Sequence, residues 1–287
     1  MANSPLNAKQ STRLIIYATI LGLTTPTKAY AELMFYPTRV VINDKQRSAT
    51  VEMINREPGP ATYRITIVNR RMTEAGEIID ADTPQVGELF SKDMLSYAPR
   101  QVTLPAGASQ ILRVSVRRPP GLATGEYRSH ILFRRVADAV GSSNLKNAAS
   151  QSGPGQLRIV MQALVGASIP VIVRQGATRA TVTLDALSIE PATGTLPSML
   201  DFRFNRTGNG STYGDLTAVY SAPGKKPIEI GRVDGIAVYA PNLVRTARLA
   251  LALPVGASIH GGILTLSYAE NTAAGGARLA ESKIAVP

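Results

Sequence analysis

Residues 156–174 have the sequence QLRIVMQALVGASIPVIVR, a stretch longer and more apolar than a strand of an ordinary two-sheet domain needs. The preceding residues 138–155 are small, polar and rich in Gly and Ser, which is typical of a loop. Eight apolar residues of the stretch fall on one parity, so a strand with a period of two would place these eight on one face, whereas the opposite parity is mixed and includes Val160 and Leu164. The pattern predicts a long strand that is partly unpaired until another protein binds it. The eight residues are Ile159, Met161, Ala163, Val165, Ala167, Ile169, Val171 and Val173.

The first 31 residues have the pattern of a secretory signal peptide. Lys9 and Arg13 precede the uncharged run 14–23, and the small-x-small triplet Ala29-Tyr30-Ala31 follows it. The run has about ten residues, whereas a helix that spans a membrane needs roughly twenty. We therefore expect a signal peptide, a mature chain that starts at Glu32, export from the cytoplasm, and no membrane insertion.

The composition narrows the classes of function. The 287 residues include no cysteine, so disulfides contribute nothing to stability in an exported compartment where they could form. Lys and Arg number 31 against 20 for Asp and Glu, and loss of the signal peptide would leave 28 against 20, about +8. Such a charge is compatible with an acidic surface, nucleic acid or lipid. Export excludes most nucleic-acid roles and no dense basic helix is present, so we expect no nucleic-acid partner.

Nearly every segment of the mature chain has the pattern of a β-strand, and turn residues separate the segments. Seven alternating segments predict an immunoglobulin-like sandwich over residues 32–175. The pattern begins again after Gly176, which predicts a second β-sandwich over 176–287 and an all-β fold class. Strands are expected at 33–42, 48–55, 62–69, 101–104, 109–117, 126–136 and 156–174 in the first domain. In the second they are expected at 180–189, 199–205, 214–220, 227–230, 235–239, 246–253, 262–268 and 279–286.

The sequence favours neither a catalytic nor a metal centre. Its two histidines are His130 and His260 and it has no thiol, so a nucleophile with an adjacent base has few candidates. Both histidines are interpreted as structural. Glu77, Asp80 and Asp82 form an acidic cluster without the loop spacing of a calcium site, and they are interpreted as solvated surface. No glycine-rich loop joins a strand to a helix, so we expect no nucleotide cofactor and no enzyme.

Several short motifs occur in the order and spacing of a known family. They are Phe35-Tyr36-Pro37-Thr38-Arg39-Val40, Pro105-Ala106-Gly107 before a strand ending in Leu112-Arg113-Val114, Gly125-Glu126-Tyr127-Arg128-Ser129-His130, and Ala167-Ser168-Ile169-Pro170-Val171. With these motifs the chain resembles the periplasmic pilus-assembly chaperones of the chaperone-usher pathway, most strongly over 33–174. The Ile-Pro pattern resembles the divergent branch, called archaic or alternative. The resemblance implies a periplasmic location and two domains in an L-shaped arrangement.

The resemblance also implies a mechanism for the long strand. In that family the chaperone lends the last strand of its first domain to a pilus subunit whose own sandwich lacks one strand. Ladder hydrogen bonds would hold the subunit backbone, and alternate side chains would fill the groove of the subunit. By position the inserted residues would be Ile159, Met161, Ala163 and Val165. The alternative is that these four side chains face the core of their own domain.

A charged anchor for the C-terminal carboxylate of the subunit is a further implication. Arginine suits this role because its planar guanidinium can bind a carboxylate through two hydrogen bonds. Arg39 matches the first-strand arginine of the better-known branch, whereas Pro170 stands at the position of its last-strand lysine, with Arg174 the nearest base. Arg128, in a Tyr-Arg pair, matches the anchor of the divergent branch. We expect Arg128 first and Arg39 second; the alternative is that either makes an inter-domain ion pair.

The sequence thus predicts a non-enzymatic periplasmic chaperone that binds pilus subunits by donor-strand complementation and delivers them to an outer-membrane usher. Self-association is expected as a way to cover the strand edge when no subunit is bound. The alternative from another class is a structural pilus subunit or adhesin built from two sandwiches, which would need a donated extension before its first strand. A secreted enzyme or carbohydrate-binding module is less favoured, because the chain has no Trp and few aromatic residues.

Overall fold

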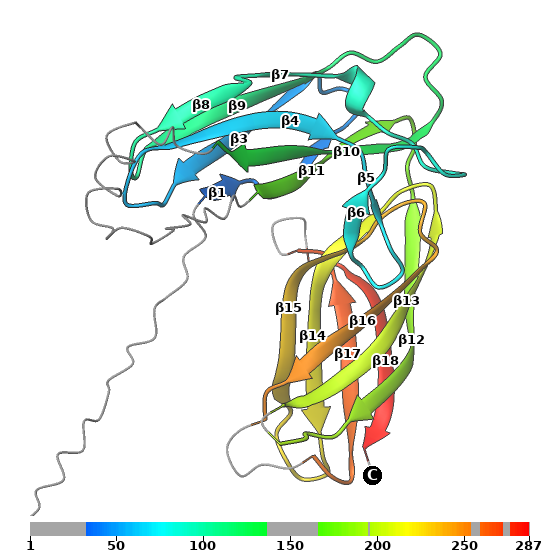
Figure 1. The fold of residues 1–287 in the computed structure, drawn as a ribbon. Helices are drawn as coiled ribbons and strands as arrows, with labels where there is room; N and C mark the ends of the chain where they lie inside the picture. The colour runs from blue at the N-terminus through cyan, green and yellow to red at the C-terminus, as the bar shows by residue number, and fades with distance from the viewer. Residues whose placement is uncertain (1–32, 137–165, 195, 254–258, 272–275, 287) are drawn as a thin grey trace, which may run out of the picture. The chain divides into compact units, whose positions relative to one another are not determined.

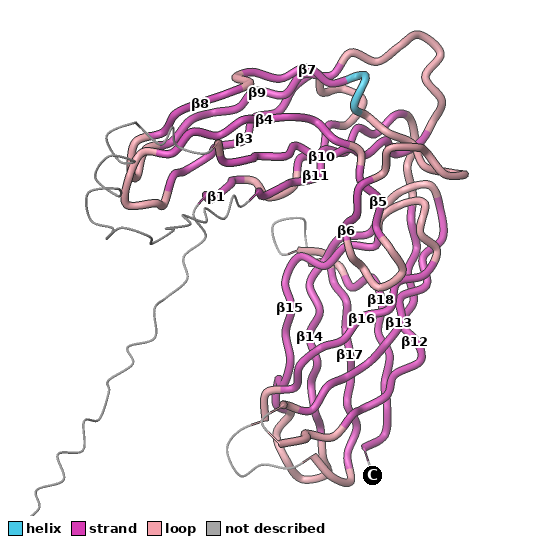
Figure 2. Tube along the Cα trace, viewed as in Figure 1, coloured by secondary structure: helices cyan, strands magenta, loops and turns pink. Residues whose placement is uncertain are grey.

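The computed structural model describes residues 33–136, 166–194, 196–253, 259–271 and 276–286, and they form almost only β-strands (Figure 1, Figure 2). Burial follows the period of two: in β4 (Ala61–Val68) the buried residues are Ala61, Tyr63, Ile65 and Ile67. Such alternation buries one face of each strand against a facing sheet. Four of the sheets form two sandwiches, so the predicted all-β class with two sandwiches is confirmed.

The first sandwich is built from a four-stranded and a five-stranded sheet around one apolar core. The four-stranded sheet has the order β1 (Leu33–Tyr36), β3 (Ser48–Asn55), β9 (Ser109–Val116), β7 (Leu95–Ala98). The five-stranded sheet has the order β2 (Val40–Ile42), β11 (Gly166–Gln175), β10 (Gly125–Arg135), β4, β8 (Gln101–Leu104). A short 3-10 helix, η1 (Lys92–Met94), precedes β7.

The strand predicted over 33–42 is wrong as a single element. The chain forms β1, which pairs antiparallel with β3, and then β2, which pairs parallel with β11 in the other sheet. Pro37 lies between them and has no N–H to donate to a ladder, so the first strand ends before it. The break carries the chain from one sheet to the other, with Arg39 directly before β2.

A hairpin that the sequence pattern did not predict follows β4. It consists of β5 (Arg70–Met72) and β6 (Ile78–Asp80), and the acidic residues 77, 80 and 82 on it are exposed, as expected. Met72 is buried with Ile172 of β11 and with Ala237 and Tyr239 of the second sandwich. The hairpin therefore contributes apolar contacts between the two sandwiches, which lie in one compact unit over residues 32–287.

Within β11 the predicted parity is confirmed over the described residues. Ile169, Val171 and Val173 are buried in the core of the first sandwich. Ile172 has the opposite parity and is also buried, because Met72 of the hairpin and Tyr239 cover that face of the strand. The four residues predicted to insert into a subunit, Ile159, Met161, Ala163 and Val165, lie outside the described residues.

The second sandwich has a three-stranded and a four-stranded sheet around its own core. The predicted strands 227–230 and 235–239 are one strand, β15 (Ile228–Val238). Its pairing with β14 (Thr212–Ser221) is interrupted by two register shifts. Gly235 lies in this irregular part with φ 72, and its N–H donates to Asp215 at 2.8 Å. The sheets have the orders β12 (Ala180–Glu190), β13 (Ser198–Gly208), β16 (Val244–Leu251), and β15 (Ile228–Val238), β14 (Thr212–Ser221), β17 (Gly262–Ala269), β18 (Arg278–Val286).

The predicted boundary between residues 175 and 176 falls in the connection between β11 and β12. The assignment of 32–175 and 176–287 as domains, and the L-shaped arrangement, stay predictions. The predicted signal peptide lies outside the described residues.

Candidate ligand-binding cleft

A cleft of ≈ 300 Å³ is lined by residues of both sandwiches. Its charged lining consists of three arginines and one glutamate: Arg39 before β2, Arg174 in β11, Arg179 before β12 and Glu270 after β17. The structure therefore places two of the three predicted anchor residues, Arg39 and Arg174, on one cleft. Its excess of cationic side chains is suited to an anionic group of a ligand.

Arg39 presents hydrogen-bond donors that nothing in the described chain satisfies. Its guanidinium carbon lies 4.6 Å from the centre of the Tyr213 ring, a cation–π contact. The buried Nε and Nη2 atoms of Arg39 have no hydrogen-bond partner among the described residues. A buried donor without a partner costs free energy, and an anion is the partner that an arginine binds best.

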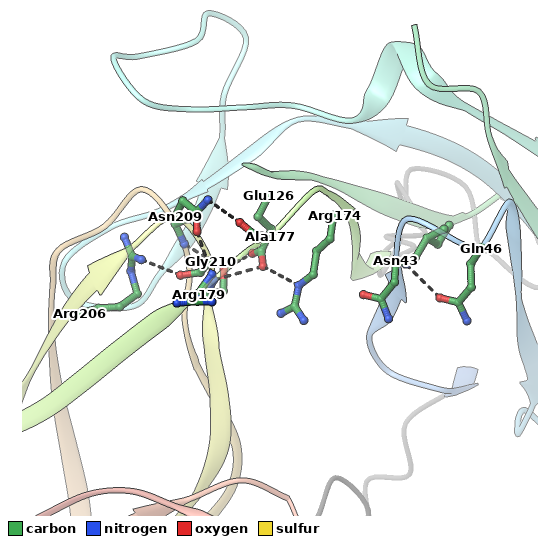
Figure 3. A network of polar contacts seen from close by, with 12 residues as sticks. Asn43, Gln46, Glu126, Arg174, Ala177, Arg179, Arg206, Asn209 and Gly210 are labelled. Atoms are coloured by element: carbon green, nitrogen blue, oxygen red, sulfur yellow. Dashed lines mark hydrogen bonds and ion pairs between the residues drawn. The ribbon is translucent and has the colours of Figure 1, made fainter. Parts of the chain in front are cut away.

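Arg174, in contrast, is already paired with a carboxylate of the protein. Its Nε lies 3.2 Å from Oε2 of Glu126, a side chain of β10 that is almost completely buried. Glu126 also accepts hydrogen bonds from the N–H of Ser211 at 3.2 Å and from the Ser211 hydroxyl. The hydroxyl oxygen in turn accepts from the N–H of Ala240 at 3.0 Å. Glu126 thus joins β10, β11 and the second sandwich, as part of the network in Figure 3.

A buried arginine of β13, Arg206, holds the loop that carries Ser211. It is 2 % exposed and donates to the carbonyl oxygens of Asn242 at 2.7 Å and Gly208 at 2.8 Å. It also donates to the carbonyl oxygen of Gly210 at 2.6 Å (Figure 3). Burial lowers the pKa of Arg206, and Glu126 acts in the opposite direction. The sequence pattern did not indicate this residue, because a single Arg within a strand has no distinguishing spacing.

The same loop also positions Arg179 at the cleft. Asn209 accepts the N–H of Arg179 at 2.8 Å and donates to the carbonyl of Ala177 at 3.1 Å (Figure 3). Gly208 has φ +97, and a Cβ added there would lie 2.2 Å from the carbonyl oxygen of Arg179. A glycine is required at this position, because both the φ and the close approach exclude a side chain.

Arg128, the first-ranked anchor in the sequence analysis, is a buried side chain in the structure. It is 4 % exposed, and its guanidinium carbon lies 4.3 Å from the centre of the Tyr239 ring. Its Nε and Nη1 atoms have no partner among the described residues. Burial lowers the pKa of Arg128, whereas Tyr239, Glu126 and Glu88 raise it.

Neither Arg39 nor Arg128 makes an ion pair with a carboxylate in the part of the chain that the structure describes. Each instead stacks on a tyrosine of the second sandwich, Tyr213 for Arg39 and Tyr239 for Arg128. The alternative of an inter-domain ion pair therefore describes neither Arg39 nor Arg128 among the described residues, and Arg174 pairs with Glu126 of its own sandwich.

The two histidines occupy different environments. His130 is 2 % exposed in β10, and burial, together with the charges of Arg128 and Arg70, lowers its pKa from 6.5 to about 3. It is therefore neutral over the physiological range. His260 has an exposed side chain, and its backbone exchanges hydrogen bonds with the Tyr220 hydroxyl at 2.7 and 3.1 Å.

We expect His130 to make folding stability depend on pH. Since its folded pKa lies below its unfolded value of 6.5, the unfolded chain binds a proton between pH 6.5 and about 3 that the folded chain does not. Stability should fall as pH falls through this window, by roughly 2–3 kcal/mol at pH 4.5. Urea unfolding at pH 7 and pH 4.5 measures the loss of stability between the two pH values. His130→Leu should remove the part of this loss that comes from protonation of the unfolded chain at His130. His260→Ala, the matched control, should keep it; equal pH dependence in wild type and His130→Leu would contradict the assignment.

No cluster of three or more His, Asp or Glu side chains among the described residues has the geometry to hold a metal ion. None of the described helical segments has the length and apolar character needed to cross a membrane.

Comparison with known proteins finds similarity only at the level of solved structures. No protein-family model matches the sequence, and no curated protein matches it. The Pseudomonas aeruginosa CupB2 chaperone is similar at 10% identity and a TM-score of 0.44, over 88% of this chain and 100% of that chain. A chain of the chaperone–tip adhesion subunit complex CsuC–CsuE, from archaic chaperone-usher Csu pili of Acinetobacter baumannii, is similar at 11% identity and 0.43, over 89% and 98%. A chain of the Salmonella enterica SafA pilin complex with the SafB chaperone is similar at 13% identity and 0.40, over 91% and 98%.

Each of these structures is, or contains, a chaperone.

Proposed function

We propose that this protein is a periplasmic chaperone that binds pilus subunits by donor-strand complementation and delivers them to an outer-membrane usher. The observation that carries the proposal is the cleft, where Arg39 has unsatisfied donors and cationic residues exceed acidic ones. A C-terminal carboxylate of a subunit would supply the missing acceptor. No catalytic group is assigned, and no cofactor or metal has a role in this proposal.

Among the three arginines, we assign the direct contact with the carboxylate to Arg39. Arg174 already pairs with Glu126, and Arg128 is almost fully buried against Tyr239. We assign Arg128 a supporting electrostatic role, since it lies close enough to Arg39 for the charge of Arg39 to lower the pKa of Arg128. This order differs from the one expected from sequence, because burial is not visible in a two-residue motif.

A free strand edge supports the proposal that subunits bind by donor-strand complementation. β11 pairs with β10 along the whole length of β11, from Gly166 to Gln175. In contrast, β11 pairs with β2 only from Val171 to Val173. Over residues 166–170 the outer edge of β11 thus has no partner strand in the described part of the chain. β1 is likewise the outermost strand of its sheet. Unpaired edges of this kind bind extended segments by strand addition.

Capture of a subunit tests the proposal. The protein should form a soluble one-to-one complex when it is co-produced in a periplasm with an exported β-sandwich subunit encoded beside it. A Met161→Asp, Val165→Asp double variant should recover at least about tenfold less complex, because burying an unpaired charge in the groove of the subunit is costly. Its melting temperature should stay near that of the wild type, since the proposal places both side chains in the partner.

Val86→Asp is the control, because Val86 is a fully exposed apolar side chain of the first sandwich. It should leave capture unchanged. An equal loss of stability in the double variant would place the two side chains in the core of their own domain. No complex with any neighbouring subunit would favour the alternative of a structural pilus subunit or adhesin.

A further inference from the structure

A second cavity, of ≈ 780 Å³, is lined by residues of the second sandwich and by Ala75 of the β5–β6 hairpin, and it shares no lining residue with the cleft. Its apolar lining comes from both sheets: Phe202 and Ala247 from one, and Leu216, Val233 and Ile236 from the other. The edge strands β15 and β16 both contribute residues to the lining. Its volume is within the roughly 300–1,000 Å³ of small-molecule sites, which are also mostly apolar.

One partly buried cation, Arg245 of β16, lines this cavity. Its Nη1 donates to the carbonyl oxygen of Ala237, and its buried Nε has no partner in the described chain. Burial lowers the pKa of Arg245. Gly76 of the β5–β6 hairpin leaves the space for the guanidinium, since a Cβ added there would lie 2.5 Å from Nε of Arg245. The guanidinium is thus held in place without a carboxylate partner among the described residues.

The other charged residues of the lining are compensated. Arg248 Nε lies 2.6 Å from the Asp201 carboxylate, and Arg203 Nε lies 2.8 Å from Asp185. Arg245 is therefore the cation of this cavity whose charge the described residues leave unpaired. The electrostatic complement of the cavity is a single negative charge next to a mostly apolar volume.

The backbone at the rim is in a strained conformation. Ala186 lines the cavity and has φ 52, the one positive φ of a non-glycine residue among those described. It lies in β12 where the pairing with β13 shifts between Asp185 and Ser188. Residues with a side chain rarely adopt this conformation, and such strain is concentrated at binding and catalytic sites.

We propose that this cavity binds a small molecule that combines an aliphatic chain with one carboxylate. The chain would contact Val233, Ile236 and Ala247, and the carboxylate would accept hydrogen bonds from Arg245. An apolar ligand without charge would leave Arg245 unpaired, and a cation would be repelled by it. The site is separate from the cleft, so the inference does not depend on the proposed chaperone function.

Isothermal titration with dodecanoate, below its micelle concentration, tests the proposal on the purified protein. Dodecanol and dodecyltrimethylammonium have the same chain with no charge and with the opposite charge. We expect dodecanoate to bind at least about tenfold more tightly than either, because a hydrogen bond to a charged group is strong in an apolar site. Arg245→Gln should remove that preference and leave the affinity for dodecanol unchanged.

Two further variants make the result interpretable. Ala247→Phe places a large side chain in the cavity and should abolish binding of both dodecanoate and dodecanol, with an unfolding transition that remains cooperative. Arg232→Gln is the control, since Arg232 is an exposed arginine of β15 paired with Asp234 at 2.9 Å, and it should bind dodecanoate like the wild type. Absence of dodecanoate binding to the folded wild type, or equal affinity in Arg245→Gln, would overturn the proposal.

Discussion

Arg39→Ala should reduce the affinity for a subunit with a free C-terminal carboxylate by at least about thirtyfold. The variant removes the guanidinium that stacks on Tyr213 and whose Nε and Nη2 atoms have no partner in the described chain. Loss of one member of a desolvated charge pair costs roughly 2–5 kcal/mol, because the remaining carboxylate is left unpaired. The fold should persist, since Arg39 is only partly buried and no described carboxylate depends on it.

The measurement compares two peptides that correspond to the C-terminal strand of the subunit, one with a free carboxylate and one with a C-terminal amide. Wild type should prefer the free acid, and Arg39→Ala should bind both peptides equally weakly. Arg100→Ala is a matched control, because Arg100 also stacks on a tyrosine, Tyr97 at 4.9 Å, but does not line the cleft. It should keep the preference for the acid.

A different outcome would relocate the anchor within the same cleft. If Arg39→Ala keeps the preference and Arg128→Ala or Arg174→Ala loses it, that arginine makes the contact instead. If neither the wild type nor any variant distinguishes the free-acid peptide from the amide peptide, the cleft does not bind a carboxylate.

Arg206→Ala should destabilise the protein by about 3–5 kcal/mol, the cost expected when a buried polar network loses its donor. The carbonyl oxygens of Asn242, Gly208 and Gly210 would lose the guanidinium that now lies 2.6–2.8 Å from them. The loop would then no longer hold Ser211 against Glu126. Urea unfolding followed by circular dichroism measures the change in the free energy of unfolding.

Arg203→Ala provides the comparison on the same strand. Arg203 is 44 % exposed and pairs with Asp185, which is also exposed, so its removal should not change stability measurably. Equal effects of the two variants would show that Arg206 has no special role in the loop. If Arg206→Ala lowers the free energy of unfolding but does not weaken subunit capture, the loop stabilises the fold but does not position the cleft.

Patterns with a period of two predicted much of the fold correctly. Ile169, Val171 and Val173 share one parity and one core. Most predicted strands agree with the structure to within a few positions, but β7 (Leu95–Ala98) was not predicted. The division of 33–42 into β1 and β2 could also have been predicted from the sequence, because Pro37 has no N–H to donate to a strand ladder. The β5–β6 hairpin could not have been predicted in this way, since each of its strands has three residues, too few to show a period of two.

The resemblance selected the arginines by motif but had no information on their surroundings. Arg39 and Arg174 come from distant segments and meet on one cleft, while Arg128 is buried under Tyr239, a residue more than a hundred positions away. Glu126 neutralises Arg174 only because the fold brings Ser211 and β11 to the same carboxylate.

Local alternation and turn residues are therefore sufficient to predict an all-β chain with two sandwiches, since they act between neighbours along the sequence. Burial, the pairing of charges and the unsatisfied donors of Arg39 and Arg245 depend on contacts between distant segments. They follow from the tertiary structure, because a guanidinium is free or paired according to which carboxylates the fold brings within a few ångströms of it.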